Sequence, residues 1–155
     1  MNKKIPITAG ALLAPFTLAV IGLSLSSPSL QTPAVSPSQV YTWDCEIPVQ
    51  KPKAITFTCG DGNMYVEEID WSRWDSKRAT GTGKYTTNTC DPDCADGTFI
   101  SAPVKITLSH LTERKKKFYL RTLEIQSKDG KNLPKMQSNS YEWDVMEFVE
   151  MMEGM

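Results

Sequence analysis

The sequence predicts an all-β fold, either a small β-sandwich or a partly open barrel of five to seven strands stapled by disulfides. Three observations support this prediction. Short segments rich in β-branched and aromatic residues alternate between apolar and polar side chains. Turn-forming Gly, Asn and Asp residues cluster between these segments. Four cysteines lie in the same part of the chain, as is usual in small exported domains.

The first expected strands lie between residues 54 and 89. In residues 54–59, Ile55 and Phe57 alternate with threonines, and a Cys-Gly-Asp-Gly-Asn turn follows. Residues 64–71 form a second strand, in which the Glu67-Glu68 pair suggests a bulge or a change of face. Residues 84–89 are polar but rich in Thr, which fits an edge strand.

A hairpin is expected in the second half of the chain. Residues 99–111 are rich in β-branched side chains but are interrupted by Pro103, and residues 118–126 alternate in polarity. The intervening segment TERKKK, residues 112–117, has the length of a hairpin loop. Its basic side chains could contact an anionic surface polymer or lipid headgroups, but a solvated tip that discourages edge pairing is favoured.

The C-terminal segment fits two structures. Asn139 and Glu142 have the spacing of a capping box. A short helix would place five apolar side chains on one face: Tyr141, Val145, Phe148, Val149 and Met152. Tyr141, Trp143 and Val145 also alternate as in a strand, and both structures remain open.

The first 34 residues are expected to lie outside the folded domain. Two lysines precede an uncharged segment, residues 5–25, in the order of a signal peptide. This segment has 21 residues, whereas signal peptides have apolar segments of about 7 to 15 residues. An N-terminal membrane anchor, with residues 5–25 as the tether, is therefore the alternative. A Ser/Pro-rich leader follows, then a linker at 35–39 and a single β domain at 40–155.

Either interpretation predicts a secreted or extracytoplasmic protein, because Lys3 and Lys4 stay on the cytoplasmic side of the membrane and the rest of the chain is exported. Removing Lys3 and Lys4 from the 17 basic residues leaves 15 against 18 acidic residues, a net charge of −3. A nucleic-acid partner is not expected, since it would require a basic surface.

Cys45, Cys59, Cys90 and Cys94 are predicted to form two disulfides. Proximity along the chain favours Cys45 with Cys59 and Cys90 with Cys94, but the crossed pairings remain open. A metal or redox site is less well supported, because the closest pair has C-x-x-x-C spacing and His110 is the only histidine. No cofactor is expected.

Asp91, Asp93 and Asp96 precede Gly97 in a segment similar to a calcium-binding loop. The third acid and the glycine each lie one position beyond their usual places. A turn shaped by the nearby cysteines accounts for the same residues, so calcium is the weaker hypothesis.

Trp71, Arg73 and Trp74 are candidates for a ligand platform, although a scaffold role is favoured. Because Trp71 shares strand parity with Ile69, we expect Trp71 to be the buried ring and Trp74 to cover an edge. Four acidic residues lie close to the tryptophans in sequence: Glu67, Glu68, Asp70 and Asp75. A hydrolase that uses one of these carboxylates therefore remains open. No catalytic residue is assigned, since His110 lacks a recognisable orienting set.

Several segments in order resemble a family of small secreted actinobacterial proteins of uncharacterised activity. They are CGDGN, IDWSRW, ATGTG, CDPDCADGTF and APVKITLSH, and the resemblance covers about residues 59–125. It implies an exported β domain with disulfides and assigns no ligand or catalytic residue.

The sequence thus predicts an exported, non-enzymatic binding or structural module of the cell envelope or the secreted fraction. The alternatives are a secreted hydrolase that uses a carboxylate near Trp71 and Trp74, and an envelope assembly protein anchored by residues 5–25.

Overall fold

The computed structural model describes residues 34–155. The predictions of a signal peptide, an anchor or a tether at residues 5–25 lie outside this range. Within it, no helix has the length and apolar character needed to cross a membrane.

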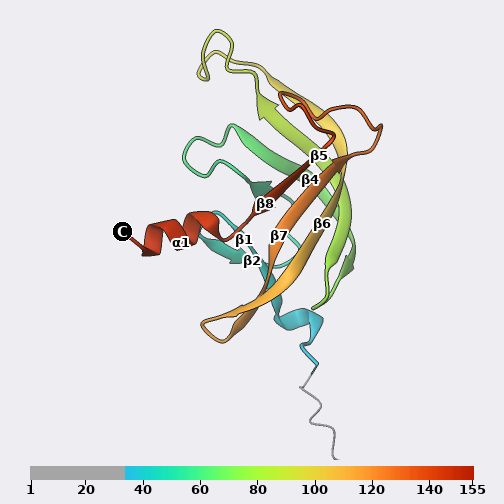
Figure 1. The fold of residues 1–155 in the computed structure, drawn as a ribbon, viewed down its shortest axis with the longest axis vertical. Helices are drawn as coiled ribbons and strands as arrows, with labels where there is room; N and C mark the ends of the chain where they lie inside the picture. Colours follow the sequence, from blue (N-terminus) through green and yellow to red (C-terminus); the bar gives the residue numbers. More distant parts are fainter. Residues whose placement is uncertain (1–33) are drawn as a thin grey trace, which may run out of the picture. The chain divides into compact units, whose positions relative to one another are not determined.

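The described residues form one strongly curled sheet, a half-barrel that confirms the all-β, partly open barrel prediction (Figure 1). Its strands run in the order β2-β1-β7-β6-β5-β4-β3, and β8 pairs separately with β7. The bounds are β1 (Val40–Asp44), β2 (Ile47–Val49), β3 (Ile55–Thr56), β4 (Met64–Trp74), β5 (Ala79–Asn88), β6 (Phe99–Arg114), β7 (Lys117–Ser127) and β8 (Ser140–Asp144).

All but one of the sheet's pairings are antiparallel. The exception is β1, which runs parallel to the start of β7 through the pairs Val40–Phe118 and Tyr41–Tyr119. Farther along the same edge of β7, β8 takes over the pairing. The opposite edge of β7 pairs with β6 along its whole length, so β7 is a central strand.

The predicted strand segments correspond to β3 to β7, with altered ends. β6 continues through Pro103, whose carbonyl accepts the N–H of Lys128 beyond the end of β7. Lys115 and Lys116 alone connect β6 to β7, since Arg114 already pairs with Lys117. β1 and β2 were not expected, because they are short and lack a clear alternating pattern.

The pairing of β4 with β5 is irregular. β4 has register shifts between Glu67 and Asp70 and between Trp71 and Arg73, and Glu68 has φ of 51°. The predicted bulge at the Glu67-Glu68 pair is thus confirmed. The neighbouring strand β5 contains Gly81. A Cβ atom added at this position would lie 2.5 Å from the carbonyl oxygen of Asp70. Only a residue without a side chain allows this close approach of the two backbones.

The curl brings the two ends of the strand order together. The Asp44 carboxylate accepts the backbone N–H of Thr56 at 2.9 Å, which links β1 to β3. The Cys45–Cys59 disulfide joins the same two regions, with Cα atoms 5.5 Å apart. The second disulfide, Cys90–Cys94, closes the loop between β5 and β6. Both pairings are those favoured by proximity.

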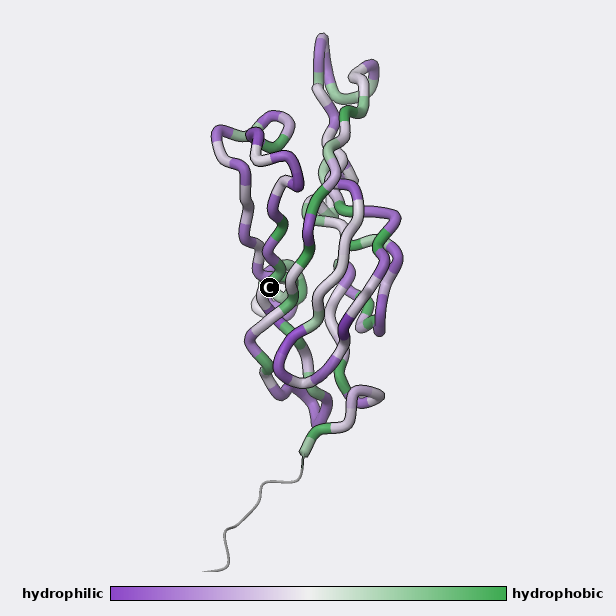
Figure 2. Tube along the Cα trace, turned by 90° about the vertical axis from the view of Figure 1, so that its right-hand side faces the viewer, coloured by the Kyte–Doolittle hydropathy of each residue, from purple (hydrophilic) through white to green (hydrophobic). Residues whose placement is uncertain are grey.

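The core fills the concave side of the sheet. Alternation of hydrophilic and hydrophobic residues is visible along the strands in Figure 2. The largest fully buried side chains include Tyr85, Ile55, Ile69, Ile106, Leu108, Leu120, Leu123 and Ile125. Phe57 packs edge-on against Tyr141 and Trp143, with ring centroids 5.9 and 6.2 Å away, and so fills the gap between β3 and β8.

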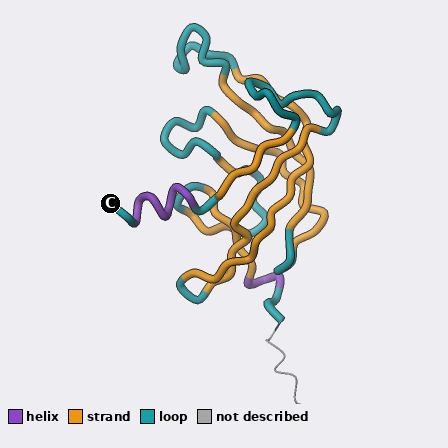
Figure 3. Tube along the Cα trace, in the orientation of Figure 1, coloured by secondary structure: helices purple, strands orange, loops and turns teal. Residues whose placement is uncertain are grey.

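The C-terminal segment contains both of the structures that its sequence allowed (Figure 3). Residues 140–144 form β8, and α1 (Glu147–Glu153) follows. The capping box predicted at Asn139 is wrong, because the helix begins after Met146. Strand pairing with β7 and contacts with Phe57 hold Tyr141 and Trp143 in extended structure.

Ion pairs fasten α1 to the sheet. Arg121 on β7 contacts Asp144 at 2.6 Å and Glu150 at 2.8 Å. Arg114, at the end of β6, pairs with Glu153 and lies 6.0 Å from the centre of the Trp43 ring. Together with buried Val149, these contacts fix a helix too short to be stable alone.

The folded unit begins earlier than the expected start at Val40. Residues 37–39, expected to be linker, form the 3₁₀ helix η1 (Pro37–Gln39). Ser36 and Gln39 cap this helix, and Val35 packs against the core. The Ser and Pro residues here therefore cap and begin a helix rather than form a free linker.

The two disulfides should contribute unequally to stability. Replacing Cys45 and Cys59 with Ser should lower the free energy of unfolding by about 3 kcal/mol, and replacing Cys90 and Cys94 by about 2 kcal/mol, because the second loop is shorter. Urea denaturation measures both losses. Thiol titration of the denatured, unreduced protein should find no reactive group, and two or more would contradict the pairing.

Candidate functional site

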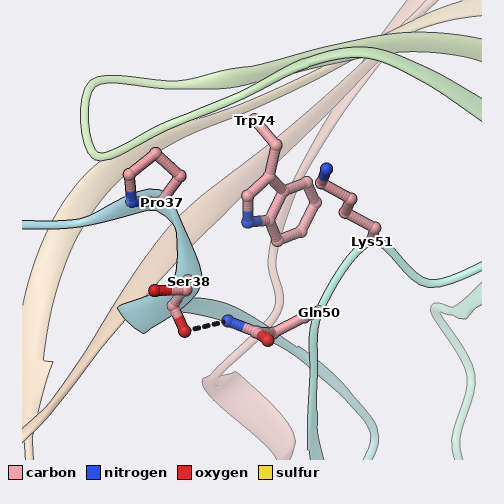
Figure 4. Close-up of a pocket in the computed structure, with 5 residues that line it drawn as sticks. All are labelled: Pro37, Ser38, Gln50, Lys51 and Trp74. Carbon is pink, nitrogen blue, oxygen red and sulfur yellow. Dashed lines mark hydrogen bonds between the residues drawn. The ribbon is translucent and has the colours of Figure 1, made fainter.

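A cavity with a volume of about 430 Å³ lies beside η1. Five residues from three separate segments line it: Pro37, Ser38, Gln50, Lys51 and Trp74. Figure 4 shows the Trp74 ring between Pro37 and Lys51. The cavity combines an aromatic ring with hydroxyl, amide and ammonium groups, a composition typical of a binding site for a polar ligand.

Trp74 belongs to both the core and the cavity. It is 8% exposed, and its indole Nε1 donates a hydrogen bond of 3.1 Å to the carbonyl oxygen of Val40. Trp71 is only half-buried, and its Nε1 donates to the carbonyl oxygen of Pro52 at 2.8 Å. The two rings meet edge to face, with centroids 5.0 Å apart.

The expectation that Trp71 is the buried ring and Trp74 the peripheral one is therefore wrong. The reason is the second bulge of β4, between Trp71 and Arg73. A bulge adds one residue and reverses which side chains point inward. Trp74 consequently faces the core, although simple alternation from Trp71 would turn it outward.

Gln50 shapes the floor of the cavity. Its side-chain Nε2 donates to the carbonyl oxygen of Ser38 at 2.7 Å and to that of Val40 at 3.0 Å. Both amide hydrogens are thus used, and the amide oxygen remains available to accept a bond from a ligand. Lys51, the next residue, is exposed and has φ of 46°.

A second cavity adjoins the first at Ser38 and has a volume of about 180 Å³. Its lining contains Ser38, Gln39, Tyr41, Lys116, Lys117 and Phe118. A third cavity, of about 190 Å³, lies between Phe57 and α1 and is mostly apolar. Sequence reasoning did not find either of these sites, because their residues are scattered along the chain.

In the predicted platform the Trp71 and Trp74 rings are in contact, but Arg73 does not stack on them. The Arg73 side chain pairs with Asp75 at 2.6 Å. The cation–π contacts found in residues 34–155 are Arg114 on Trp43 and Lys117 on Tyr41, so Arg73 stacks on neither tryptophan. Of the three, Trp74 alone lines a cavity described above.

Three of the four acidic residues near the tryptophans, Glu67, Glu68 and Asp75, have structural partners, and Asp70 is exposed. Glu67 accepts a hydrogen bond from Thr86, and Glu68 pairs with Lys84 at 2.6 Å. Hydrogen bonds from Arg73 and from two backbone N–H groups lower the pKa of Asp75 to about 2. A general acid needs a raised pKa, so Asp75 is unsuited to that role.

Asp93 shapes its own loop. Its Oδ1 accepts the backbone N–H groups of Ala95 and Asp96 at 2.9 and 3.0 Å. A Cβ at Gly97 would collide with the Asn88 side chain, so glycine is required for the loop to close. Asp91, Asp93 and Asp96 do not form a cluster that could hold a metal ion, and neither do other acidic, His or Cys residues in 34–155.

His110 is exposed at the surface of β6. Its Nδ1 shares hydrogen bonds with the hydroxyls of Thr122 at 2.9 Å and Ser109 at 3.3 Å. Neither partner is a carboxylate, so this contact set differs from that of a Ser-His-Asp site.

Comparison with known proteins provides no family assignment, because no family model, no curated protein and no solved structure matches the chain. The resemblance to secreted actinobacterial proteins therefore stays a prediction. The candidate site must be interpreted from its own chemistry.

Trp74 should be more important for stability than Trp71. Trp74→Ala should lower the free energy of unfolding by about 3 to 5 kcal/mol, because it removes a large buried ring. Trp71→Ala should cost less, since that ring is half-buried. Urea denaturation of both variants measures the difference. A larger loss at Trp71 would contradict the packing described for β4.

Calcium should leave the melting temperature unchanged, because Asp93 already binds the backbone of its loop. A calcium site filled at 100 times its dissociation constant would add about 2.7 kcal/mol to stability. Thermal melts with calcium chloride and with a chelator test this expectation. A shift that Asp93→Ala abolishes would restore the calcium hypothesis.

Proposed function

We propose that the protein is an exported, non-catalytic saccharide-binding module and that the cavity beside η1 is its binding site. The observation that carries the proposal is the lining of this cavity by the Trp74 ring, Ser38, Gln50 and Lys51. A sugar ring has apolar faces and hydroxyl edges. An indole can pack against the first, while amide, hydroxyl and ammonium groups bind the second.

Two disulfides support the exported location. Such bonds persist in extracellular or otherwise oxidising environments, and all four cysteines are paired. The expected signal peptide or anchor agrees with this location. The rigid framework around the cavity also suits binding, because Cys45–Cys59 restrains the segment that leads to Gln50 and Lys51.

The lining also favours binding over hydrolysis. Glycoside hydrolysis generally needs two converging carboxyl groups. The residues that surround the Trp74 cavity include no carboxylate, and Glu67, Glu68 and Asp75 are engaged elsewhere. The hydrolase alternative therefore has less support than a binding role.

Nuclear magnetic resonance of the full folded protein tests the proposal with a panel of soluble neutral and acidic glycans. A binding glycan should shift the indole N–H of Trp74 and the side-chain amide of Gln50. The indole N–H of Trp143, beside the third cavity, is the internal control.

The same incubations are assayed for new reducing ends, and none should appear. Shifts confined to Trp143, or no shift with any glycan, would refute a saccharide site at Trp74. Production of reducing ends would instead support the hydrolase alternative.

A further inference from the structure

Three lysines gather around η1 without carboxylate partners. Lys51 lines the cavity with Trp74, and Lys116 and Lys117 line the adjoining one. None of the three forms an ion pair within residues 34–155, in contrast to Lys115, which pairs with Glu153 at 3.0 Å. Ser38 lines both cavities, so the three lysines belong to two cavities that meet at this residue.

Stability of the hairpin does not explain its lysines. Lys115 and Lys116 form the two-residue loop between β6 and β7, with φ values of 48° and 64°. Such loops favour Asn-Gly, because positive φ is costly for residues with longer side chains. Lysine at both positions is thus unfavourable for the turn and places cationic side chains at its tip.

The Tyr41 ring holds the ammonium group of Lys117 in place. The Lys117 Nζ lies 5.4 Å from the centre of the Tyr41 ring, and Tyr41 lines the same cavity. The attraction between an ammonium group and an aromatic face keeps Lys117 at the cavity. Ser38 and Gln39 add hydroxyl and amide groups that can donate hydrogen bonds to an anionic oxygen.

The three lysines lie in a domain of net negative charge. Residues 34–155 have a net charge of −3, because the 17 basic residues include Lys3 and Lys4 and all 18 acidic residues lie beyond position 33. Acidic side chains of β8 and α1 neutralise Arg114, Lys115 and Arg121. Lys51, Lys116 and Lys117 thus place three unpaired cations around η1 in a domain of net negative charge.

We propose that the two adjoining cavities bind one acidic polysaccharide, with a sugar ring against Trp74 and its anionic groups beside Lys51, Lys116 and Lys117. This inference rests on the proposed function and names its ligand class. A polymer fits better than a lipid surface, because a flat bilayer cannot place a group in the recess that contains Trp74. Repeated anionic groups along one chain can reach both cavities.

Isothermal titration calorimetry tests the inference with a dextran sulfate oligosaccharide and neutral dextran of the same length. The sulfated form should bind at least tenfold more tightly, and added salt should weaken it by screening. A variant with Lys51→Gln, Lys116→Gln and Lys117→Gln should lose at least tenfold in affinity. The matched control, Lys105→Gln, Lys128→Gln and Lys131→Gln, removes the same charge elsewhere and should bind like the parent protein.

Lys116→Gly separates binding from folding. Glycine suits the positive φ of this position, so the melting temperature should stay equal or rise. Affinity for dextran sulfate should nevertheless fall. Unchanged affinity would show that Lys116 does not contact the ligand and would overturn its role.

The remaining outcomes distinguish the inference from the proposed function. If neutral dextran binds as tightly as dextran sulfate and shifts the indole N–H of Trp74, the preference for an acidic ligand is overturned, but the saccharide site is preserved. Equally tight binding of inorganic polyphosphate, without a shift at Trp74, would overturn recognition of a sugar. Binding to phosphatidylglycerol vesicles but not to dextran sulfate would identify a lipid surface instead. Failure of every neutral and acidic glycan would refute the proposed function itself.

Discussion

The curl of the sheet is the constraint on which the rest of the structure depends. Two bulges interrupt the pairing of β4 with β5. Gly81 and Gly83 of β5 allow the two backbones to approach at a distance that a Cβ atom would prevent. The curl brings β3, the last strand of the order, to β1, where Cys59 bonds with Cys45.

Closure of the sheet also builds the candidate site. The carbonyl oxygen of Val40 accepts hydrogen bonds from both the Trp74 indole and the Gln50 amide. One backbone group at the start of β1 thereby joins the end of β4 to the segment after β2. The cavity walls are parts of the scaffold, so a ligand would meet a largely pre-formed site and little ordering of side chains would oppose binding.

Charges are divided between two roles in this small domain. Arg114, Lys115 and Arg121 contact acidic groups of β8 and α1, where several pairs share partners and together position the helix. Lys116 and Lys117 directly follow Arg114 and Lys115 in sequence but line the second cavity beside η1. The tight turn between β6 and β7 separates these neighbours, because consecutive side chains of a hairpin diverge.

The sequence by itself determined the all-β class and the approximate positions of β3 to β7, and it favoured the local disulfide pairing and suggested the first bulge. These features follow from patterns a few residues long, such as the alternation at Ile55 and Phe57 and the short separations of the cysteines. The tertiary structure alone decided which tryptophan is buried, because the second bulge turns the Trp74 side chain to the other face of the sheet. It also decided the cavity, since the curled sheet brings Ser38, Gln50 and Trp74 together from segments far apart in sequence.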